Sequence, residues 1–305
     1  MSADFTRRDV LRIAGGTFGA AALAGVSAIA RQEPEENRRR PIKKAVKLGM
    51  VAGEMTLGEK FRLLKDLGFD GVELDSPNGF DLDEVLRARD EAQLPIHGVV
   101  DSVHWKSPLS HPDPEVRAKG LSGLTTALEE AARYGATTVL LVPAIVNKDV
   151  SYADAYARSQ AEIRKALPVA EKLDVKIAIE NVWNNFLLSP LEAAQYVDAF
   201  ESAHIGWYFD VGNIVNYGWP EQWVRILGRR ILKLDIKEYS RKKRNEEGLW
   251  KGFAVKLLEG DCDWPAVMAA LDEIEYKGWA TAEVAGGDAA RLRDIARRMD
   301  RIFAL

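Results

Sequence analysis

The chain has 305 residues, with 42 Lys and Arg against 46 Asp and Glu, which gives a formal net charge of −4. A mildly acidic protein with no basic half is a poor candidate for binding nucleic acid. The single cysteine, Cys262, excludes an intramolecular disulfide, so the fold must be stabilised by core packing.

The first 30 residues have the features of an export signal. Arg7 and Arg8 precede an uncharged stretch at 13–30 of mostly small apolar residues, which ends in Ala-Ile-Ala. This pattern is typical of a twin-arginine signal cleaved after Ala30. A membrane anchor is the alternative reading, but the richness in Gly and Ala would make it a weak anchor. We therefore expect an exported, periplasmic or otherwise extracytoplasmic protein with no stable membrane association after cleavage.

Residues 31–44 are charged, contain two prolines and offer no apolar face. These features predict a solvated linker. The remaining part, 45–305, is long enough for one barrel of eight βα units, which typically needs about 250 residues.

Short β-rich runs alternate with amphipathic stretches along this part of the chain. Strands are predicted at 47–51, 71–74, 95–100, 137–142, 175–180, 205–210, 231–237 and 279–284. Helices are predicted at 57–67, 82–92, 115–134, 152–172, 190–200, 221–227, 264–274 and 289–303. Strict alternation favours parallel pairing with right-handed crossovers, and eight units predict an α/β fold of the (β/α)8 TIM-barrel type. The first predicted strand is followed by no Gly-rich phosphate loop, so a doubly wound nucleotide-binding fold is less favoured.

Four acidic residues stand at the ends of four successive predicted strands: Glu180, Asp210, Asp235 and Glu283. The carboxyl ends of parallel strands meet at one rim of a barrel, so these side chains are expected to converge. Four carboxylates at one point would repel one another unless a cation joined them. A set of oxygen ligands suits Mn²⁺ or Mg²⁺ better than Zn²⁺. For any one of these residues, a helix cap or a surface salt bridge is the alternative.

Four segments around these residues also carry a family resemblance: ENVWNNFLLSPLE at 180–192, YFDVGN at 208–213, DIKEYSR at 235–241 and the AE that closes GWATAE. They resemble the sugar phosphate isomerase/epimerase superfamily with a xylose isomerase-like barrel. The similarity is greatest to L-ribulose-5-phosphate (L-xylulose-5-phosphate) 3-epimerases and looser to D-tagatose 3-epimerases. It runs from about residue 46 to the C-terminus.

The resemblance implies that Glu180 and Glu283 are metal ligands that also form an acid/base pair, and that Asp210 is a ligand only. The family's histidine ligand falls on Asp235, and a second family histidine falls on Asn213. A family arginine is retained as Arg241. The aspartate keeps coordination feasible but leaves four carboxylates and a divalent cation at a formal charge of −2.

Nearby cations are expected to offset this charge. Lys233, Lys237 and Arg241 are close in sequence to Asp235, and strand alternation gives Lys233, Asp235 and Lys237 the same facing. We therefore expect Lys237 to pair with Asp235. A purely supporting role in the ligand shell is an equal alternative to a role on the substrate.

Several further side chains on the predicted rim are candidates for binding a sugar. Glu73 and the amides of Asn184 and Asn185 suit hydroxyl groups, while Trp183 offers a stacking face. His104, beside Trp105, is favoured over His97. In each case a structural role is the alternative.

The predicted chemistry is proton transfer next to a carbonyl. One glutamate would remove the proton and the other would return one from the opposite face of the enediolate, which is epimerisation. Return to the neighbouring carbon would be aldose–ketose isomerisation. An exported enzyme is expected to act on a non-phosphorylated ketose or keto-sugar.

Two alternatives remain open from the sequence. A lyase or hydratase acting on 3-keto-glycosides needs the same enolate, and a non-catalytic sugar-binding barrel would explain the residues at 213 and 235 as decay of the site. The resemblance is compatible with a homo-oligomer, although no stretch identifies an interface.

Overall fold

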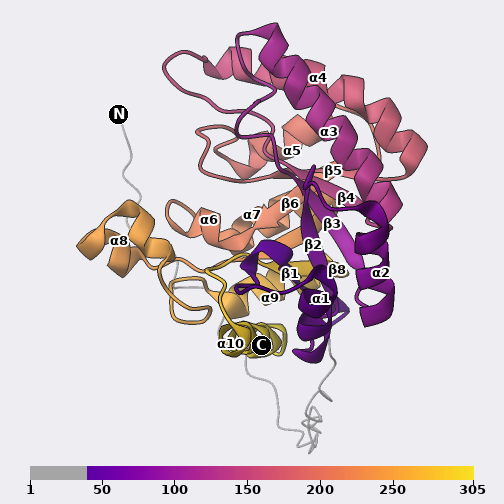
Figure 1. The fold of residues 1–305 in the computed structure, drawn as a ribbon. Coiled ribbons are helices and arrows are strands. Elements are labelled where there is room, and N and C mark those ends of the chain that lie inside the picture. Colours follow the sequence, from indigo (N-terminus) through magenta and orange to yellow (C-terminus); the bar gives the residue numbers. More distant parts are fainter. Residues whose placement is uncertain (1–39) are drawn as a thin grey trace, which may run out of the picture. The chain divides into compact units, whose positions relative to one another are not determined.

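The computed structural model describes residues 40–305, so the predicted export signal and residues 31–39 of the predicted linker lie outside the described residues. Eight parallel strands pair in chain order, and β8 closes the sheet against β1, which makes a barrel (Figure 1). The strands are β1 (Ile42–Lys47), β2 (Gly71–Ser76), β3 (Ile96–Asp101), β4 (Thr138–Leu141), β5 (Lys176–Glu180), β6 (Ile205–Asp210), β7 (Ile231–Ile236) and β8 (Gly278–Ala282). The predicted (β/α)8 barrel is confirmed.

Helices surround the sheet on its outer face (Figure 1). The α-helices are α1 (Leu57–Asp66), α2 (Leu82–Ala92), α3 (Pro114–Tyr134), α4 (Tyr152–Leu173), α5 (Pro190–Asp198), α6 (Val211–Val215), α7 (Pro220–Leu227), α8 (Arg241–Glu247), α9 (Trp264–Glu273) and α10 (Ala289–Phe303). Short 3-10 helices are η1 (Leu48–Met50), η2 (Gly228–Arg230) and η3 (Leu249–Phe253). The predicted helices are all present, and α6 and α8 are two that the pattern did not predict.

The first strand is the one element that was predicted in the wrong place. Residues 47–51 were expected to form it, but β1 ends at Lys47 and continues into η1. Two consecutive lysines in IKKAVK concealed the start of the strand, so residues 42–44 were assigned to the linker. Lys43 is exposed, whereas Lys44 is buried and reaches Asp300 with its ammonium group, 2.6 Å away. The barrel therefore begins inside the segment assigned to the linker.

Helix ends follow local signals in the sequence. Ser189 caps α5 by accepting a hydrogen bond from the Glu192 amide, and Pro190 occupies the first turn. Gly135 ends α3 at φ 76°, a left-handed conformation that glycine adopts without a steric penalty.

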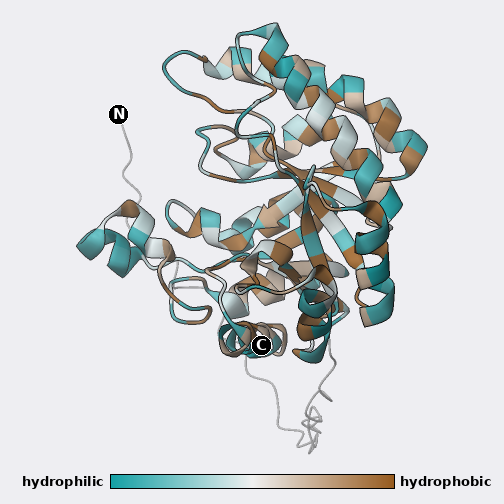
Figure 2. Cartoon of the chain, viewed as in Figure 1, coloured by the Kyte–Doolittle hydropathy of each residue, from teal (hydrophilic) through white to brown (hydrophobic). Residues whose placement is uncertain are grey.

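The hydrophobic core lies mainly between the sheet and the helices, where apolar residues of the strands meet the inner faces of the helices (Figure 2). A much smaller apolar cluster of Leu140, Ala178 and Tyr208 is separate from it. In the described part of the chain, no helix is both long enough and apolar enough to cross a membrane.

Polar side chains from several strands form a buried network. The Tyr208 hydroxyl donates to Glu73 Oε1 over 2.9 Å and lies 2.8 Å from Thr281 Oγ1. Thr281 Oγ1 is 3.1 Å from His97 Nε2, and His97 Nδ1 is 3.0 Å from the ammonium nitrogen of Lys233. Burial lowers the pKa of Lys233 to about 7, although the negative charge of Glu73 acts against this shift.

Candidate metal centre

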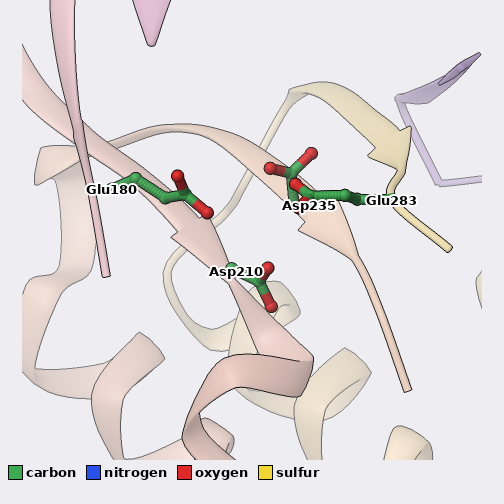
Figure 3. A group of neighbouring side chains, drawn as sticks. All are labelled: Glu180, Asp210, Asp235 and Glu283. Carbon is green, nitrogen blue, oxygen red and sulfur yellow. The ribbon is translucent and has the colours of Figure 1, made fainter. Parts of the chain in front are cut away.

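Four carboxylates from four neighbouring strands meet at the carboxyl end of the barrel (Figure 3). Glu180, Asp210 and Asp235 belong to the ends of β5, β6 and β7, and Glu283 directly follows β8. One oxygen from each residue lies within 4.8 Å of the others. Asp210 and Asp235 are also register partners in the sheet. The structure thus brings together all four residues that the sequence proposed as ligands.

Two lysine ammonium groups are inserted among these carboxylates. Lys47 Nζ lies 2.6 Å from Glu283 Oε2 and 3.2 Å from Asp235 Oδ2. Lys237 Nζ lies 2.8 Å from Asp210 Oδ2 and 2.8 Å from Glu283 Oε1. The expected pair of Lys237 with Asp235 is therefore wrong, because Lys237, directly after β7, pairs with Asp210 and Glu283 instead. Lys47, at the end of β1, occupies the place beside Asp235.

These contacts change the charge of the site. Four carboxylates with two ammonium groups carry a formal charge of −2, which one divalent cation would neutralise. The formal charge of −2 given from the sequence counted neither lysine, and Lys47 was not among the cations expected to offset it. A loaded centre that is neutral can accept an anionic intermediate at lower electrostatic cost.

The donor atoms fit a hard divalent cation. Asp235 Oδ1 and Asp210 Oδ2 are buried and make no hydrogen bond, although Asp210 Oδ2 has the ion pair with Lys237. Glu180 Oε1 has only a long 3.5 Å contact with Nδ2 of the Asn213 side chain. Buried carboxylate oxygens without donors are costly unless a cation satisfies them. The four residues could therefore hold such a cation, and their oxygen atoms suit Mn²⁺ or Mg²⁺.

The two glutamates have opposite pKa shifts. Burial, and then the charge of Glu283, raises the pKa of Glu180 to about 8. Burial acts to raise the pKa of Glu283 as well, but Lys237 and Lys47 hold it well below its usual range. Without a cation, one glutamate is therefore protonated and the other ionised near neutral pH, the states required of a general acid and a general base.

Burial also raises the pKa of each aspartate at the centre. The effect places the pKa of Asp235 well above its usual range despite Lys47, and it raises the pKa of Asp210 despite Lys237. The cluster thus retains protons that a bound cation would displace.

Asp210 is oriented by its own backbone and by its neighbours. Its side chain caps the one-turn helix α6, where Oδ1 accepts a hydrogen bond from the Asn213 amide over 2.8 Å. The Asn181 side chain accepts from the Asp210 amide and donates to the Asp210 carbonyl. Gly212 makes room for Lys237, because a Cβ at this position would lie 2.7–2.8 Å from the backbone and stem of that lysine.

Asn213 and Trp183 adjoin the cluster, in line with their predicted location. The Asn213 carbonyl oxygen of the side chain accepts from Lys237 over 3.2 Å, and its amide also donates to the Asn181 carbonyl. Trp183 donates from its indole nitrogen to the Asn213 backbone carbonyl over 2.8 Å. Both residues are therefore within one contact of the carboxylates.

Glu73 and His104 both lie near Lys47. Glu73 is buried inside the barrel beside its register partner Lys47, whose Nζ is 3.7 Å from Glu73 Oε2. The other oxygen of Glu73 accepts a hydrogen bond from Tyr208. Glu73 therefore belongs to the buried polar network inside the barrel as well as to the surroundings of the cluster. His104 accepts a 3.3 Å hydrogen bond from the Val142 amide at Nδ1, which leaves Nε2 as the protonated nitrogen of the neutral ring. Burial lowers the pKa of His104 to about 3.

The remaining predicted substrate ligands make contacts with the backbone. Arg241 donates from Nε to the Val215 carbonyl and from Nη2 to the Gly218 carbonyl. Asn185, which is exposed, donates to the Val146 carbonyl, and buried Asn184 donates to the Ala144 carbonyl. A direct role of these three residues on a substrate stays a prediction.

The sequence did not indicate Lys47, Asn181 or Phe253 as site residues. Lys47 was taken as the start of a strand, where its side chain would be remote from the rim. Asn181 directly follows Glu180 at the end of β5, but its hydrogen-bond partner Asp210 belongs to the neighbouring strand β6. The sequence gives no sign of this contact. Phe253 comes from η3, and the Lys237 ammonium lies 5.4 Å from the centre of its ring. A correct first strand would have placed Lys47 at the rim.

Comparisons with known proteins agree with this geometry. L-ribulose-5-phosphate 3-epimerase UlaE of Escherichia coli O1:K1 / APEC is 26% identical over 268 residues, which is 80% of this chain and 90% of the relative. This relative is a sugar epimerase, and epimerases are isomerases. The enzyme class therefore agrees with the one that the sequence resemblance implied.

Three solved structures share the fold. A D-tagatose 3-epimerase-like protein aligns with a TM-score of 0.69 at 19% identity, covering 86% of this chain and 98% of that one. The apo form of the 3-keto-D-glucoside 4-epimerase YcjR of E. coli has a TM-score of 0.70 at 17% identity, with the same coverage. The IOLI protein, whose structure has a bound zinc atom, has a TM-score of 0.72 at 14% identity, again with 86% and 98% covered.

A family model decides the assignment. The model described as xylose isomerase-like TIM barrel matches residues 61–302, which is most of the chain and all strands from β2 to β8. The chain therefore belongs to the family of xylose isomerase-like TIM barrels.

Proposed function

We propose that the chain is a metal-dependent sugar epimerase or isomerase that acts on a non-phosphorylated ketose or keto-sugar through an enediolate. The observation that carries the proposal is the convergence of Glu180 and Glu283. They extend toward each other from opposite sides of the cluster and have one oxygen each within 4.8 Å (Figure 3). A sugar carbon between two such groups can lose a proton on one face and gain one on the other.

Asp210, Asp235 and the two glutamates would hold the cation, for which we propose Mn²⁺ or Mg²⁺. When bound, it would supply a Lewis acid that polarises the substrate carbonyl and acidifies the adjacent C–H. The protein's own part is to place the two glutamates and their protons.

Lys47 and Lys237 support this placement. Each ammonium group contacts a different oxygen of Glu283, so both oxygens of this carboxylate are fixed and charged. Within residues 40–305 Glu180 has no ion pair of this kind, and burial raises its pKa to about 8, so it keeps its proton more readily. We propose that Glu283 takes the proton from one face of the sugar carbon and that Glu180 gives its own proton to the opposite face, so the two glutamates end with exchanged protonation states; the roles are reversed in the other direction.

The contacts of the cations support a substrate without phosphate. A phosphate group requires free Arg or Lys side chains, or backbone amides at a helix terminus. Lys47 and Lys237 pair with carboxylates, and Arg241 donates to backbone carbonyls. Export by the twin-arginine route, which we also propose, would place the enzyme where phosphorylated sugars are rare.

The test is deuterium exchange. Mature protein is stripped of metal, reloaded with Mn²⁺ or Mg²⁺ and incubated in D₂O with a panel of free ketoses and keto-glucosides. We expect metal-dependent exchange at one carbon of one sugar class, with a loss of at least about 100-fold in Glu180→Gln and in Glu283→Gln. Glu247→Gln, at an exposed position in α8, is the control and should retain the wild-type rate.

Other outcomes would select other functions. Release of the aglycone from a 3-keto-glucoside would indicate a lyase, which is compatible with the same pair of glutamates. No exchange with any sugar, together with no retained metal, would favour the non-catalytic sugar-binding barrel.

A further inference from the structure

An aromatic cluster extends from the metal centre to the surface of the protein. It comprises Trp183 after β5, Tyr239 after β7, and Trp250 and Phe253 in η3, and we call it the aromatic wall. The Trp183 ring lies 4.9 Å from the Trp250 ring and 4.8 Å from the Phe253 ring, measured between centroids. Tyr239 contacts Phe253 at 4.8 Å.

The inner end of the wall contacts the residues of the centre. Phe253 lies beneath the ammonium group of Lys237, 5.4 Å from ring centre to nitrogen, and Trp183 bonds to the Asn213 carbonyl. Lys237 and Asn213 in turn contact the carboxylates of Glu283 and Glu180. A molecule bound at the carboxylates would therefore lie next to these two rings.

The outer end of the wall is open to solvent. Trp250 is 69% exposed, more than any other large hydrophobic residue in the described part of the chain. The segment is nonetheless held firmly: the Tyr239 hydroxyl donates to the Leu249 carbonyl over 2.9 Å, and Gly252 packs flat against the Tyr239 ring. A cluster that served only to pack η3 would not leave its largest ring in water.

Charged side chains near the wall are directed elsewhere. Arg244 donates to the backbone and side chain of Asn216, and Lys243 donates to the Ala254 carbonyl. Helix α8, which carries these residues, projects from the body of the barrel (Figure 1). Arg244 and Lys243 are thus occupied by partners outside the wall, and the ring faces of the wall suit a flat uncharged ring.

We infer that the aromatic wall is a subsite for the second ring of a glycosidic substrate, whose keto-sugar ring lies at the carboxylate cluster. This inference rests on the proposed function. The chemistry that the wall recognises is an apolar ring face, which both an aryl aglycone and a second pyranose present. The substrate class is therefore glycosides with a cyclic aglycone, in preference to free monosaccharides.

The test measures binding with ligands that cannot react. The metal-loaded mature protein is titrated calorimetrically with methyl β-D-glucoside, phenyl β-D-glucoside and cellobiose, none of which has a keto group. We expect phenyl glucoside or cellobiose to bind about tenfold more tightly than methyl glucoside, corresponding to one good ring contact. Preference for phenyl glucoside would identify an aryl aglycone, and preference for cellobiose a second sugar.

Variants then assign the preference to the wall. Trp250→Ala should abolish it while leaving methyl glucoside binding unchanged, and Trp250→Phe should retain most of it. Trp219→Ala is the matched control, because Trp219 is 56% exposed and has no ring contact within residues 40–305. Circular dichroism checks that the variants fold.

The outcomes separate this inference from the proposed function. Equal binding of all three glucosides by the wild-type protein, or an equal loss for all three in Trp250→Ala, would overturn the subsite even if deuterium exchange succeeds. A preference that depends on Trp250 would support the subsite even if no sugar exchanged its proton.

Discussion

At the scale of single residues, the feature that distinguishes this centre is the pair of ammonium groups among its ligands. A histidine ligand would be neutral, whereas Asp235 adds a negative charge, and Lys47 lies beside it at 3.2 Å. Lys237 likewise balances the negative charge of Asp210 and Glu283. The extra charge of the aspartate is thus balanced inside the cluster and not by solvent.

Loss of one of these lysines should raise the affinity for metal, whereas loss of a ligand should lower it. Replacing Lys237 by Met removes a positive charge from beside two carboxylates, so we expect Mn²⁺ to bind about tenfold more tightly. The metal-free protein should lose about 2 kcal/mol of unfolding free energy, because a buried ion pair is broken. Calorimetric titration with Mn²⁺ and urea unfolding measure the two effects.

Asp210→Asn provides the comparison for this prediction. It removes a ligand charge while keeping the size of the side chain, and it should weaken Mn²⁺ binding. If Lys237→Met also weakened binding, the ammonium group would be holding the carboxylates in position more than it opposes the cation.

At the scale of elements, the one-turn helix α6 links the sheet to the centre. Asp210 ends β6 and begins α6, and Gly212 in the first turn lies directly against Lys237. No side chain fits between this turn and the lysine. The position of the ammonium group therefore depends on a glycine in a neighbouring element.

Gly212→Ala tests this dependence. The added methyl group would lie 2.7–2.8 Å from the backbone carbon, Cβ and Cγ of Lys237, so the lysine must move away from Asp210 and Glu283. Crowding of this kind in a packed region typically costs about 1–3 kcal/mol. We expect a fall in melting temperature of several degrees by calorimetry and a loss of about tenfold or more in deuterium exchange, with the barrel intact by circular dichroism.

Gly206→Ala, in β6, is a useful comparison, because its Cβ would also meet close atoms, 2.7–2.8 Å away, but these belong to Arg230 and Leu232 and not to Lys237. It should destabilise the protein without a specific loss of exchange relative to the folded fraction. Equal losses in both variants would indicate that Gly212 acts only through stability.

The elements also show how far the sequence could predict the fold. Seven strands follow apolar runs that are buried on both faces, and the pattern located them within a few residues. The start of the first strand was not predicted, because Lys44 was expected to be solvated. It is buried by its contacts with Asp300 and the Ala296 carbonyl in α10, over 250 residues away. A pattern of neighbouring residues in the sequence cannot predict a contact with a partner so distant in the chain.

Helix α8 illustrates a second limit. Its sequence RKKRNEE looks like a solvated charged loop, yet Arg241 and Arg244 attach the segment to residues 215–218. This attachment positions η3 and the aromatic wall beside the centre. The acidic ligands were predictable because strand ends converge by topology, whereas the aromatic wall depends on contacts of an irregular excursion.

At the scale of the whole molecule, metal binding, protonation and folding are linked through the centre. Burial raises the pKa of Glu180 to about 8, and it raises the pKa values of Asp210 and Asp235 as well. Below the unfolded pKa values, near 4, both the folded and unfolded states hold these protons. Between pH 4 and 8 the metal-free folded state holds protons that the unfolded state has lost, so its stability falls as pH rises through this window.

A bound cation reverses this trend. The ligands must be deprotonated to coordinate, so a cation competes with protons at low pH and meets less competition as the pH rises through the pKa of Glu180. We expect the rise in melting temperature caused by saturating Mn²⁺, relative to EDTA, to be small at pH 5.5 and to increase steadily to pH 8. Glu283 does not oppose this trend in the measured range, because its lowered pKa confines its contribution to pH values below about 4.5.

Glu180→Gln identifies the source of the dependence. The amide cannot ionise, so the metal-free variant should lose less stability between pH 5.5 and 8 than the wild type does, and its response to Mn²⁺ should be weaker and flatter with pH. Calorimetric titrations in two buffers of different ionisation enthalpy would count the protons released per Mn²⁺ bound. A melting-temperature shift that is independent of pH, with no proton release, would mean that the cation binds away from the four carboxylates.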